Sequence, residues 1–239
     1  MSDMGPSIGL KDYEWSSSEL LKGLCLDQIS VPRSLVENQR SPLWHLMTLE
    51  LESISFLRHL LSQRNASLSD EFVESSYLRY LDKQNHYRGL KRIASVLFDT
   101  PEYNIDLQVR RSCCEPLRSI SLPADEFALL LSVALDKATK LHASNENITR
   151  VDALGVKSLS AWIRLVIRDN TVHYGNAIDI LRRRHADRLQ EASLWLEHLA
   201  NGGQADDIAL ARLFFHDSDI YPDSLLHDSR KALLDILTA

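Results

Sequence analysis

One short stretch of the chain combines an arginine and a histidine at a spacing that suits phosphodiester chemistry. The stretch reads Arg168-Asp169-Asn170-Thr171-Val172-His173 and comes late in an apolar helical pattern that begins near Val156. An arginine can hold a phosphate through its planar guanidinium, and a histidine exchanges protons near neutral pH. The pair therefore predicts acid–base cleavage of a phosphodiester, with Arg168 and His173 as the catalytic groups.

The segment RLVIRDNTVHYG, which contains this pair, resembles the signature of the HEPN superfamily of small helical bundles. That signature is an arginine, a polar residue, and a histidine after four to six intervening residues, late in the bundle; Arg168, Asp169 and His173 match it. The resemblance covers roughly residues 121–200. It implies metal-independent RNA cleavage, in which the ribose 2′-hydroxyl attacks the adjacent phosphorus and a cyclic phosphate results. Asp169 and Asn170 would orient the two catalytic side chains or the nucleotide.

The same resemblance implies partners and a biological setting. RNA would be the substrate or ligand, the chain would form a homodimer, and a protein partner such as an antitoxin would fit a toxin–antitoxin or phage-defence role. On a straight helix, residues five positions apart point about 140° away from each other. Convergence of Arg168 and His173 therefore requires a break in the helix near Asn170–Gly175, or the meeting of two copies of the chain.

The distribution of charge offers candidate phosphate contacts. Six arginines and three aspartates lie between residues 164 and 188, whereas nine acidic and three basic residues lie between 189 and 239. The candidate nucleic-acid-binding residues are Arg182, Arg183, Arg184 and Arg188. The alternative is that these arginines form ion pairs on a solvated helix face. The net charge of −6 argues against a surface that is basic throughout.

Carboxylates and histidines recur on several of the expected helices, which raises the alternative of a dinuclear metal site in an oxidase. The spacing Glu52-x6-His59 resembles that of ligands in haem-oxygenase-like diiron oxidases, with His173 as a further ligand. The residue four positions after His173 is Ala177, however, where that family has aspartate. Two pairs four residues apart also fit contacts along a single helix surface. The full set is His45, Glu50, Glu52, His59, Asp82, His86, Asp169 and His173.

A third interpretation is a non-catalytic helical interaction protein, in which these side chains are ordinary surface residues. For the leading interpretation we expect no cofactor. Three cysteines without metal-type spacing argue against a disulfide framework. The N-terminus lacks the basic-then-apolar order of a signal peptide, and no apolar run approaches the roughly 20 residues needed to span a bilayer. We therefore expect a cytoplasmic protein without a membrane partner.

Helices must position all of these residues, because apolar residues recur at helical spacing and no segment alternates as a strand would. With only 8 glycines and 7 prolines in 239 residues, the chain is predicted to be an all-α antiparallel bundle with additional short C-terminal helices. Residues 1–40 are expected to form an N-terminal extension and 41–239 the bundle. A connection is expected over 99–122, and a helix that begins at Pro123 is expected to end at 144–147. The expected helices are 41–63, 70–97 with a bend at 82–89, 152–201 with its break, 206–215 and 224–237.

Overall fold

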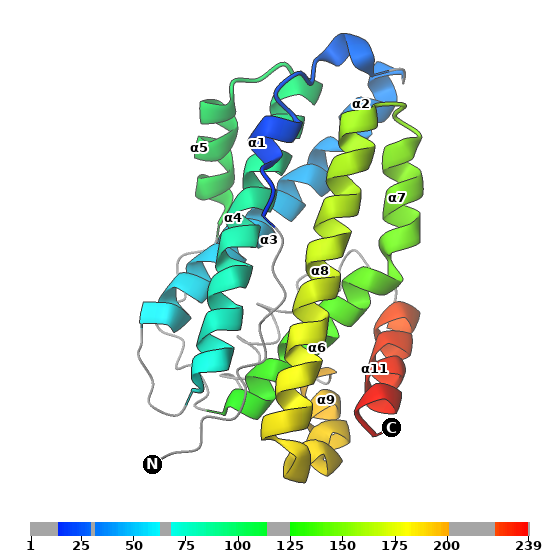
Figure 1. Cartoon of the computed structure of the whole chain (residues 1–239). Helices are drawn as coiled ribbons and strands as arrows, with labels where there is room; N and C mark the ends of the chain where they lie inside the picture. The colour runs from blue at the N-terminus through cyan, green and yellow to red at the C-terminus, as the bar shows by residue number, and fades with distance from the viewer. Residues whose placement is uncertain (1–13, 30–31, 63–67, 114–124, 201–222, 239) are drawn as a thin grey trace.

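Four long helices form the body of the protein. The computed structural model describes residues 14–29, 32–62, 68–113, 125–200 and 223–238, which contain helices and no strand. The all-α prediction is therefore confirmed. Helix α3 packs along α4, α6 packs along α8, and α4 contacts α8, to which it runs antiparallel (Figure 1). The four helices are α3 (Arg40–Ser62), α4 (Asp70–Leu97), α6 (Glu126–His142) and α8 (Lys157–Arg184).

Shorter helices surround this body. Helix α5 packs on α3 and α4, α7 packs beside α8, and the C-terminal helices α9 and α11 pack on α6. The short α-helices are α1 (Ser17–Leu20), α2 (Arg33–Asn38), α5 (Glu102–Ser112), α7 (Ser144–Asp152), α9 (Ala192–Ala200) and α11 (Asp223–Thr238), and the 3₁₀ helices are η1 (Leu26–Gln28) and η3 (Ala186–Glu191).

Local capping explains where two of the long helices begin. The Ser69 hydroxyl accepts a hydrogen bond from the Phe72 backbone N–H at 3.1 Å and starts α4. The Asp125 carboxylate does the same for the Phe127 N–H at 3.0 Å, so α6 begins at Glu126 and not at Pro123. Every residue from Glu126 to Thr139 is buried. Helix α6 is therefore enclosed on all sides, and any charged residue within it lies in the interior.

The predicted bounds agree with the structure for two of the long helices and for the C-terminal helix, and they fail for the other described helices. The predicted helices 41–63, 70–97 and 224–237 match α3, α4 and α11 to within one residue at each end. The segment 99–122 was predicted as a connection with local structure, and that structure is a full helix, α5, in its first half. Its apolar pattern consists mainly of two buried residues one turn apart, Ile105 and Val109. The predicted helix 206–215 lies outside the described residues.

Two further predictions fail around α8. The helix predicted to end at 144–147 ends earlier, because α6 ends at His142 and α7 begins at Ser144. The expected break near Asn170–Gly175 is absent, since α8 is continuous from Lys157 to Arg184. The predicted helix 152–201 is interrupted instead on either side of α8. One interruption is at Gly155, whose φ of 71° lies in the left-handed region that glycine tolerates, and the other follows Arg184, where η3 leads into α9. Glycine within a helix costs only about 1 kcal/mol, and the buried residues on either side of Gly175 hold the helix together.

The apolar core consists of two clusters. We call them the α5-side cluster and the α9-side cluster, each after a short helix that lies at the same end of the bundle. The α5-side cluster includes Met47, Leu90 and Trp162, and the described part of the N-terminal segment adds Leu21 and Leu24 to it. The α9-side cluster is built mainly from α6 and the ends of α3, α8, α9 and α11. In the described parts of the chain, no helix is both long and apolar enough to cross a membrane.

Candidate functional site

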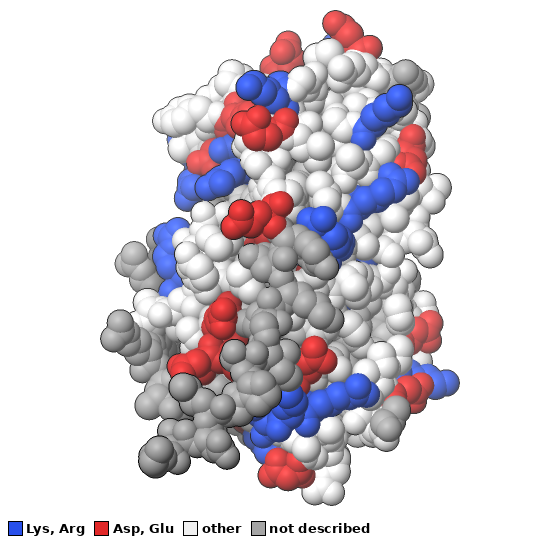
Figure 2. Space-filling model, viewed as in Figure 1, with Lys and Arg blue, Asp and Glu red and all other residues white. Residues whose placement is uncertain are grey.

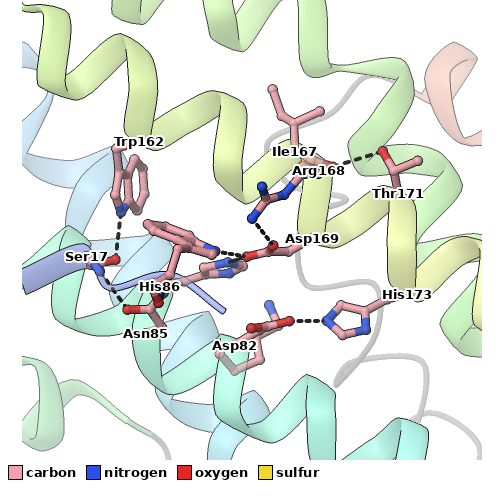
Figure 3. A network of polar contacts seen from close by, with 12 residues as sticks. Ser17, Asp82, Asn85, His86, Trp162, Ile167, Arg168, Asp169, Thr171 and His173 are labelled. Carbon is pink, nitrogen blue, oxygen red and sulfur yellow. Dashed lines mark hydrogen bonds and ion pairs between the residues drawn. The ribbon is translucent and has the colours of Figure 1, made fainter. Parts of the chain in front are cut away.

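Two Asp-x3-His repeats, one on α4 and one on α8, face each other between the two apolar clusters. His173 Nε2 lies 2.8 Å from Asp82 Oδ2, and His86 Nε2 lies 2.9 Å from Asp169 Oδ2 (Figure 3). Residues four apart share a helix face. Because α4 and α8 are antiparallel, the aspartate of each repeat meets the histidine of the other. The pairs therefore bridge the two helices and do not run along one surface.

The Asp82–His173 pair leaves one ring nitrogen of His173 without a hydrogen bond. The His173 side chain is 4% exposed and that of Asp82 is 18% exposed. An ionised carboxylate only accepts hydrogen bonds. Nε2 of a neutral His173 therefore carries the ring proton and donates a hydrogen bond to Asp82. His173 Nδ1 then presents a lone pair, and no described residue donates to this buried atom.

Burial lowers the pKa of His173 well below the usual value for histidine, and the positive charges of Lys137 and Arg79 lower it further. The imidazole is therefore neutral at physiological pH. A neutral ring with its proton on Nε2 is a proton acceptor at Nδ1. When Nδ1 takes a proton, the Asp82 carboxylate stabilises the resulting imidazolium, which is how a carboxylate assists a histidine base.

Helix α6 brings buried charges to the same level of the bundle. Lys137 Nζ lies 3.0 Å from Asp136 Oδ2, and Lys140 Nζ lies 3.0 Å from Asp136 Oδ1. Burial lowers the pKa of Lys137 to about 7, although the Asp136 carboxylate acts in the opposite direction. Burial alone would raise the pKa of Asp136, but Lys137 and Lys140 outweigh it and hold that pKa well below the usual range.

Helix α3 and the rest of α4 complete this set of charges. Lys83 Nζ donates to Glu50 Oε1 at 2.7 Å. Burial would raise the pKa of Glu50, but Lys83 outweighs it, so the pKa is lowered. Burial lowers the pKa of Arg79 to about 10. We call the whole set the polar layer, and it comprises Glu50, Arg79, Asp82, Lys83, His86, Asp136, Lys137, Asp169 and His173.

The N-terminal segment lies over the polar layer where α4 and α8 meet. Trp15 Nε1 donates to Asp169 Oδ2 at 2.7 Å, and the Trp15 and His86 ring centroids are 6.0 Å apart. Asn85 of α4 accepts from the Ser17 backbone N–H at 2.8 Å and donates to the Trp15 carbonyl at 3.1 Å. Trp15 therefore seals one side of the His86–Asp169 pair.

A glycine on α4 makes room for the next contact of this segment. Trp162 Nε1 of α8 donates to Ser17 Oγ at 2.9 Å directly above Gly89. A Cβ atom at Gly89 would lie 2.2 Å from Trp162 Nε1 and 2.8 Å from Ser17 Oγ. Only glycine permits this approach. The segment is thus fixed to α4 and α8 together.

The predicted catalytic residues occupy different positions on the unbroken α8. Asp169, Asn170 and His173 are buried, whereas the Arg168 side chain is 38% exposed. The Arg168 guanidinium nevertheless turns toward the interior, with Nη2 3.9 Å from Asp169 Oδ1. Figure 3 shows Arg168, Asp169 and His173 on the side of α8 that faces α4. The structure therefore brings Asp169 and His173 into the polar layer and places Arg168 at its edge.

The candidate phosphate-binding arginines contact acceptors of the chain itself. Arg183 donates two hydrogen bonds to the Glu71 carboxylate, at 3.0 and 2.9 Å, and Arg188 binds both Asp125 and Glu191. Arg184 lies 3.5 Å from Glu126, and Arg182 donates to the Ile236 carbonyl. In Figure 2, the Lys and Arg side chains of the described residues lie in separate groups on this face, with Asp and Glu side chains beside them.

Five of the eight residues considered for the alternative metal site lie in the polar layer, but they form separate side-chain pairs: they are Glu50, Asp82, His86, Asp169 and His173. In the ranges that the structure describes, no group of three or more His, Cys, Asp or Glu side chains is arranged to hold a metal ion. Glu50, the carboxylate on the predicted apolar stripe, is instead bound by Lys83. His173 is bound by Asp82. The described donor set therefore does not fit a dinuclear centre.

The sequence alone did not point to Lys137, Arg79 or Trp15 as parts of a site. A signal for Lys137 was present, because Asp136-Lys137 interrupts the apolar run that begins at Phe127 in a helix with no polar face. Arg79 and Trp15 carry no such signal, since their roles depend on the packing of α4 against the N-terminal segment.

Comparison of the chain with protein-family models, with curated proteins and with solved structures found no match to any of them.

Proposed function

We propose that this protein is a metal-independent endoribonuclease in which His173 is the general base and Asp82 its positioning residue. The observation that carries the proposal is the buried Asp82–His173 pair, which leaves the lone pair of Nδ1 available. A histidine oriented by a carboxylate through one nitrogen and available at the other is the arrangement that proton abstraction needs.

The chemistry follows from that arrangement and from the resemblance of the Arg168–His173 segment. Nδ1 takes the proton of a ribose 2′-hydroxyl, and the 2′-oxygen forms a bond to the adjacent phosphorus. The bond from phosphorus to the 5′-oxygen breaks, that oxygen takes a proton from water, and a 2′,3′-cyclic phosphate remains. Arg168, whose side chain is 38% exposed, would stabilise the negative charge on the phosphate oxygens.

Access to His173 requires local opening, because its side chain is 4% exposed. Trp15 and Ser17 contact α4 and α8 through four hydrogen bonds and one ring contact, and the following Leu21 and Leu24 are buried in the α5-side cluster. Each such hydrogen bond contributes only about 0.5–1.5 kcal/mol. Displacement of Trp15 would uncover the His86–Asp169 pair, which lies beside the Asp82–His173 pair on the same two helices, and we infer that RNA reaches His173 from this side.

The decisive experiment is cleavage of a labelled single-stranded RNA in excess EDTA by the wild type and by His173→Gln. Loss of a general base lowers the rate by about 10²–10⁴-fold. We therefore expect cleavage to a 2′,3′-cyclic phosphate by the wild type and none above background by the variant.

His86→Gln is the matched control, because it removes the equivalent buried histidine from the other pair. It should lower the melting temperature by about as much as His173→Gln does, yet keep at least about a tenth of the activity. Equal loss of activity in both variants would show that the pairs act only on the fold. Intact RNA with the wild-type protein would refute the proposal.

A further inference from the structure

Two buried polar atoms on neighbouring helices lack a hydrogen-bond partner among the described residues. They are Lys137 Nζ on α6 and His173 Nδ1 on α8. Lys137 Nζ contacts Asp136 Oδ2 at 3.0 Å, but the two groups are not aligned for a hydrogen bond. Helix α6 packs along α8, and both side chains are buried in the polar layer. Of the positive charges that act on His173, that of Lys137 has the strongest effect.

We propose that Lys137 and His173 form the two ends of a ribonucleotide-binding site. Lys137 Nζ donates a hydrogen bond to a phosphate oxygen, and His173 Nδ1 accepts one from the hydroxyl next to that phosphate. The inference rests on the proposed function and deepens it. It identifies Lys137 as the phosphate-binding residue and ribose, rather than deoxyribose, as the required sugar.

The chemistry of the two atoms selects this ligand. An ammonium only donates hydrogen bonds, and the Nδ1 lone pair of His173 only accepts one. A ligand that satisfies both must carry an anionic oxygen and a hydroxyl proton side by side. A ribose 2′-hydroxyl beside a 3′-phosphate carries both. A deoxyribonucleotide lacks the hydroxyl and would leave Nδ1 buried without a donor, which is costly.

Lys137 fits this role better than its neighbours do. Lys83 already donates to Glu50 at 2.7 Å. Lys140 pairs with Asp136 and keeps 20% of its side chain exposed. The Lys137 side chain is 1% exposed and extends from a helix that is enclosed on all sides. Its head cannot reach solvent as lysines on a helix surface do, so the ammonium is retained within the polar layer.

The experiment is calorimetric titration of the full chain in EDTA with adenosine 3′-monophosphate and with its 2′-deoxy analogue. The wild type should bind the ribonucleotide at least about tenfold more tightly, because only this ligand donates to Nδ1. Lys137→Met should weaken binding of both nucleotides by about tenfold or more, since each loses the charge-assisted bond to phosphate. His173→Gln should weaken binding of the ribonucleotide alone and abolish the discrimination.

Lys140→Met is the control, because it also removes a lysine partner of Asp136 but leaves Lys137 in place. Its affinities should stay within about threefold of the wild-type values. Wild-type protein that binds the two nucleotides equally, or Lys137→Met that binds as the wild type does, would overturn the inference. The wild-type comparison needs no variant, so it decides the matter even if Lys137→Met fails to fold.

The two proposals fail in different ways. RNA cleavage that depends on His173 but not on Lys137 would uphold the ribonuclease and overturn the binding site. Nucleotide binding that depends on Lys137, without any RNA cleavage, would do the reverse.

Discussion

The polar layer and the two apolar clusters on either side of it follow opposite physical rules. In the α9-side cluster, each buried side chain such as Leu131 or Ile180 adds favourable burial of apolar surface. In the polar layer, each charge loses hydration on burial and is stabilised only by its partner. Along α4 and α8, the layer separates one cluster from the other, and the half-buried ring of Tyr80 packs against both.

This difference means that the polar layer lacks the stabilisation that an apolar core would give at the same place. Replacement of a buried ion pair by apolar residues of similar volume is often neutral or stabilising, by about 1–4 kcal/mol. A bundle selected for stability alone would therefore continue its apolar core through the middle of α4, α6 and α8. The chain instead keeps charged and histidine side chains there, including Lys137 and His173, which lack full sets of hydrogen bonds among the described residues.

The largest expected effect comes from a substitution in an apolar cluster. Leu131 is fully buried in the α9-side cluster, so Leu131→Ala should lower the free energy of unfolding by about 2–5 kcal/mol. The activity of each folded molecule should remain unchanged, because the polar layer is intact. Urea unfolding and RNA cleavage, both measured at low temperature, test the two halves of this statement. A loss of specific activity beyond the unfolded fraction would show that the clusters and the layer are not separate.

The buried ionisable groups of the polar layer should make kcat/KM depend on pH. Burial and the cations of α4 and α6, above all Lys137 and Arg79, lower the pKa of His173 well below 6.5. The base form therefore persists as pH falls through 6.5, and the acid limb of kcat/KM should lie below that value. Burial lowers the pKa of Lys137 to about 7. If its ammonium binds phosphate, activity should fall about tenfold per pH unit above that point.

Lys137→Arg separates the two limbs of this profile. An arginine stays protonated to far higher pH, so the alkaline limb should disappear while the acid limb stays in place. Measurement of kcat/KM for both proteins between about pH 4.5 and pH 9 checks this. An alkaline limb that persists near pH 7 in the variant would assign it to another group.

A smaller effect is expected at the boundary of the polar layer. Trp15→Ala removes the hydrogen bond to Asp169 and the ring contact with His86. We expect the free energy of unfolding to fall by about 1 kcal/mol, and kcat/KM for RNA to rise by roughly threefold because the covering segment opens more often. Trp15→Phe keeps an aromatic ring but loses the hydrogen-bond donor, so its free energy of unfolding and its kcat/KM should lie between those of the wild type and of Trp15→Ala. Reduced cleavage by Trp15→Ala would show that Trp15 supports the site and does not cover it.

The sequence predicted the long helices because their apolar residues recur over many turns, as Met47, Ile54 and Leu61 do on α3. It failed at α5, where only Ile105 and Val109 are buried. It also suggested a break at Asn170–Gly175, since polar residues and a glycine interrupt the apolar pattern there. Those polar residues face other polar residues on α4, so the helix continues. An interruption of an apolar pattern can mark a polar interior as well as a break.

The candidate site was only partly predictable for a similar reason. The spacing of Asp82 to His86 and of Asp169 to His173 is visible in the sequence, and each could pair along its own helix. The cross-helix pairing depends on the antiparallel register of α4 and α8, which no local pattern contains. Trp15 donates a hydrogen bond to Asp169, which lies 154 residues further along the chain. Such contacts follow from tertiary packing alone.

The smallest effect is expected for the arginines in the last turn of α8. These residues allow surface charges to be compared with the buried charges of the polar layer. Arg183 forms a bidentate pair with Glu71 on side chains that are 32% and 29% exposed. Exposed pairs contribute only about 0–1 kcal/mol to stability. Because the guanidinium is already bound, Arg183→Ala should change KM for RNA by less than about twofold. A KM that rises tenfold and depends less steeply on salt would instead assign this arginine to phosphate binding and return the RNA-binding surface to the end of α8.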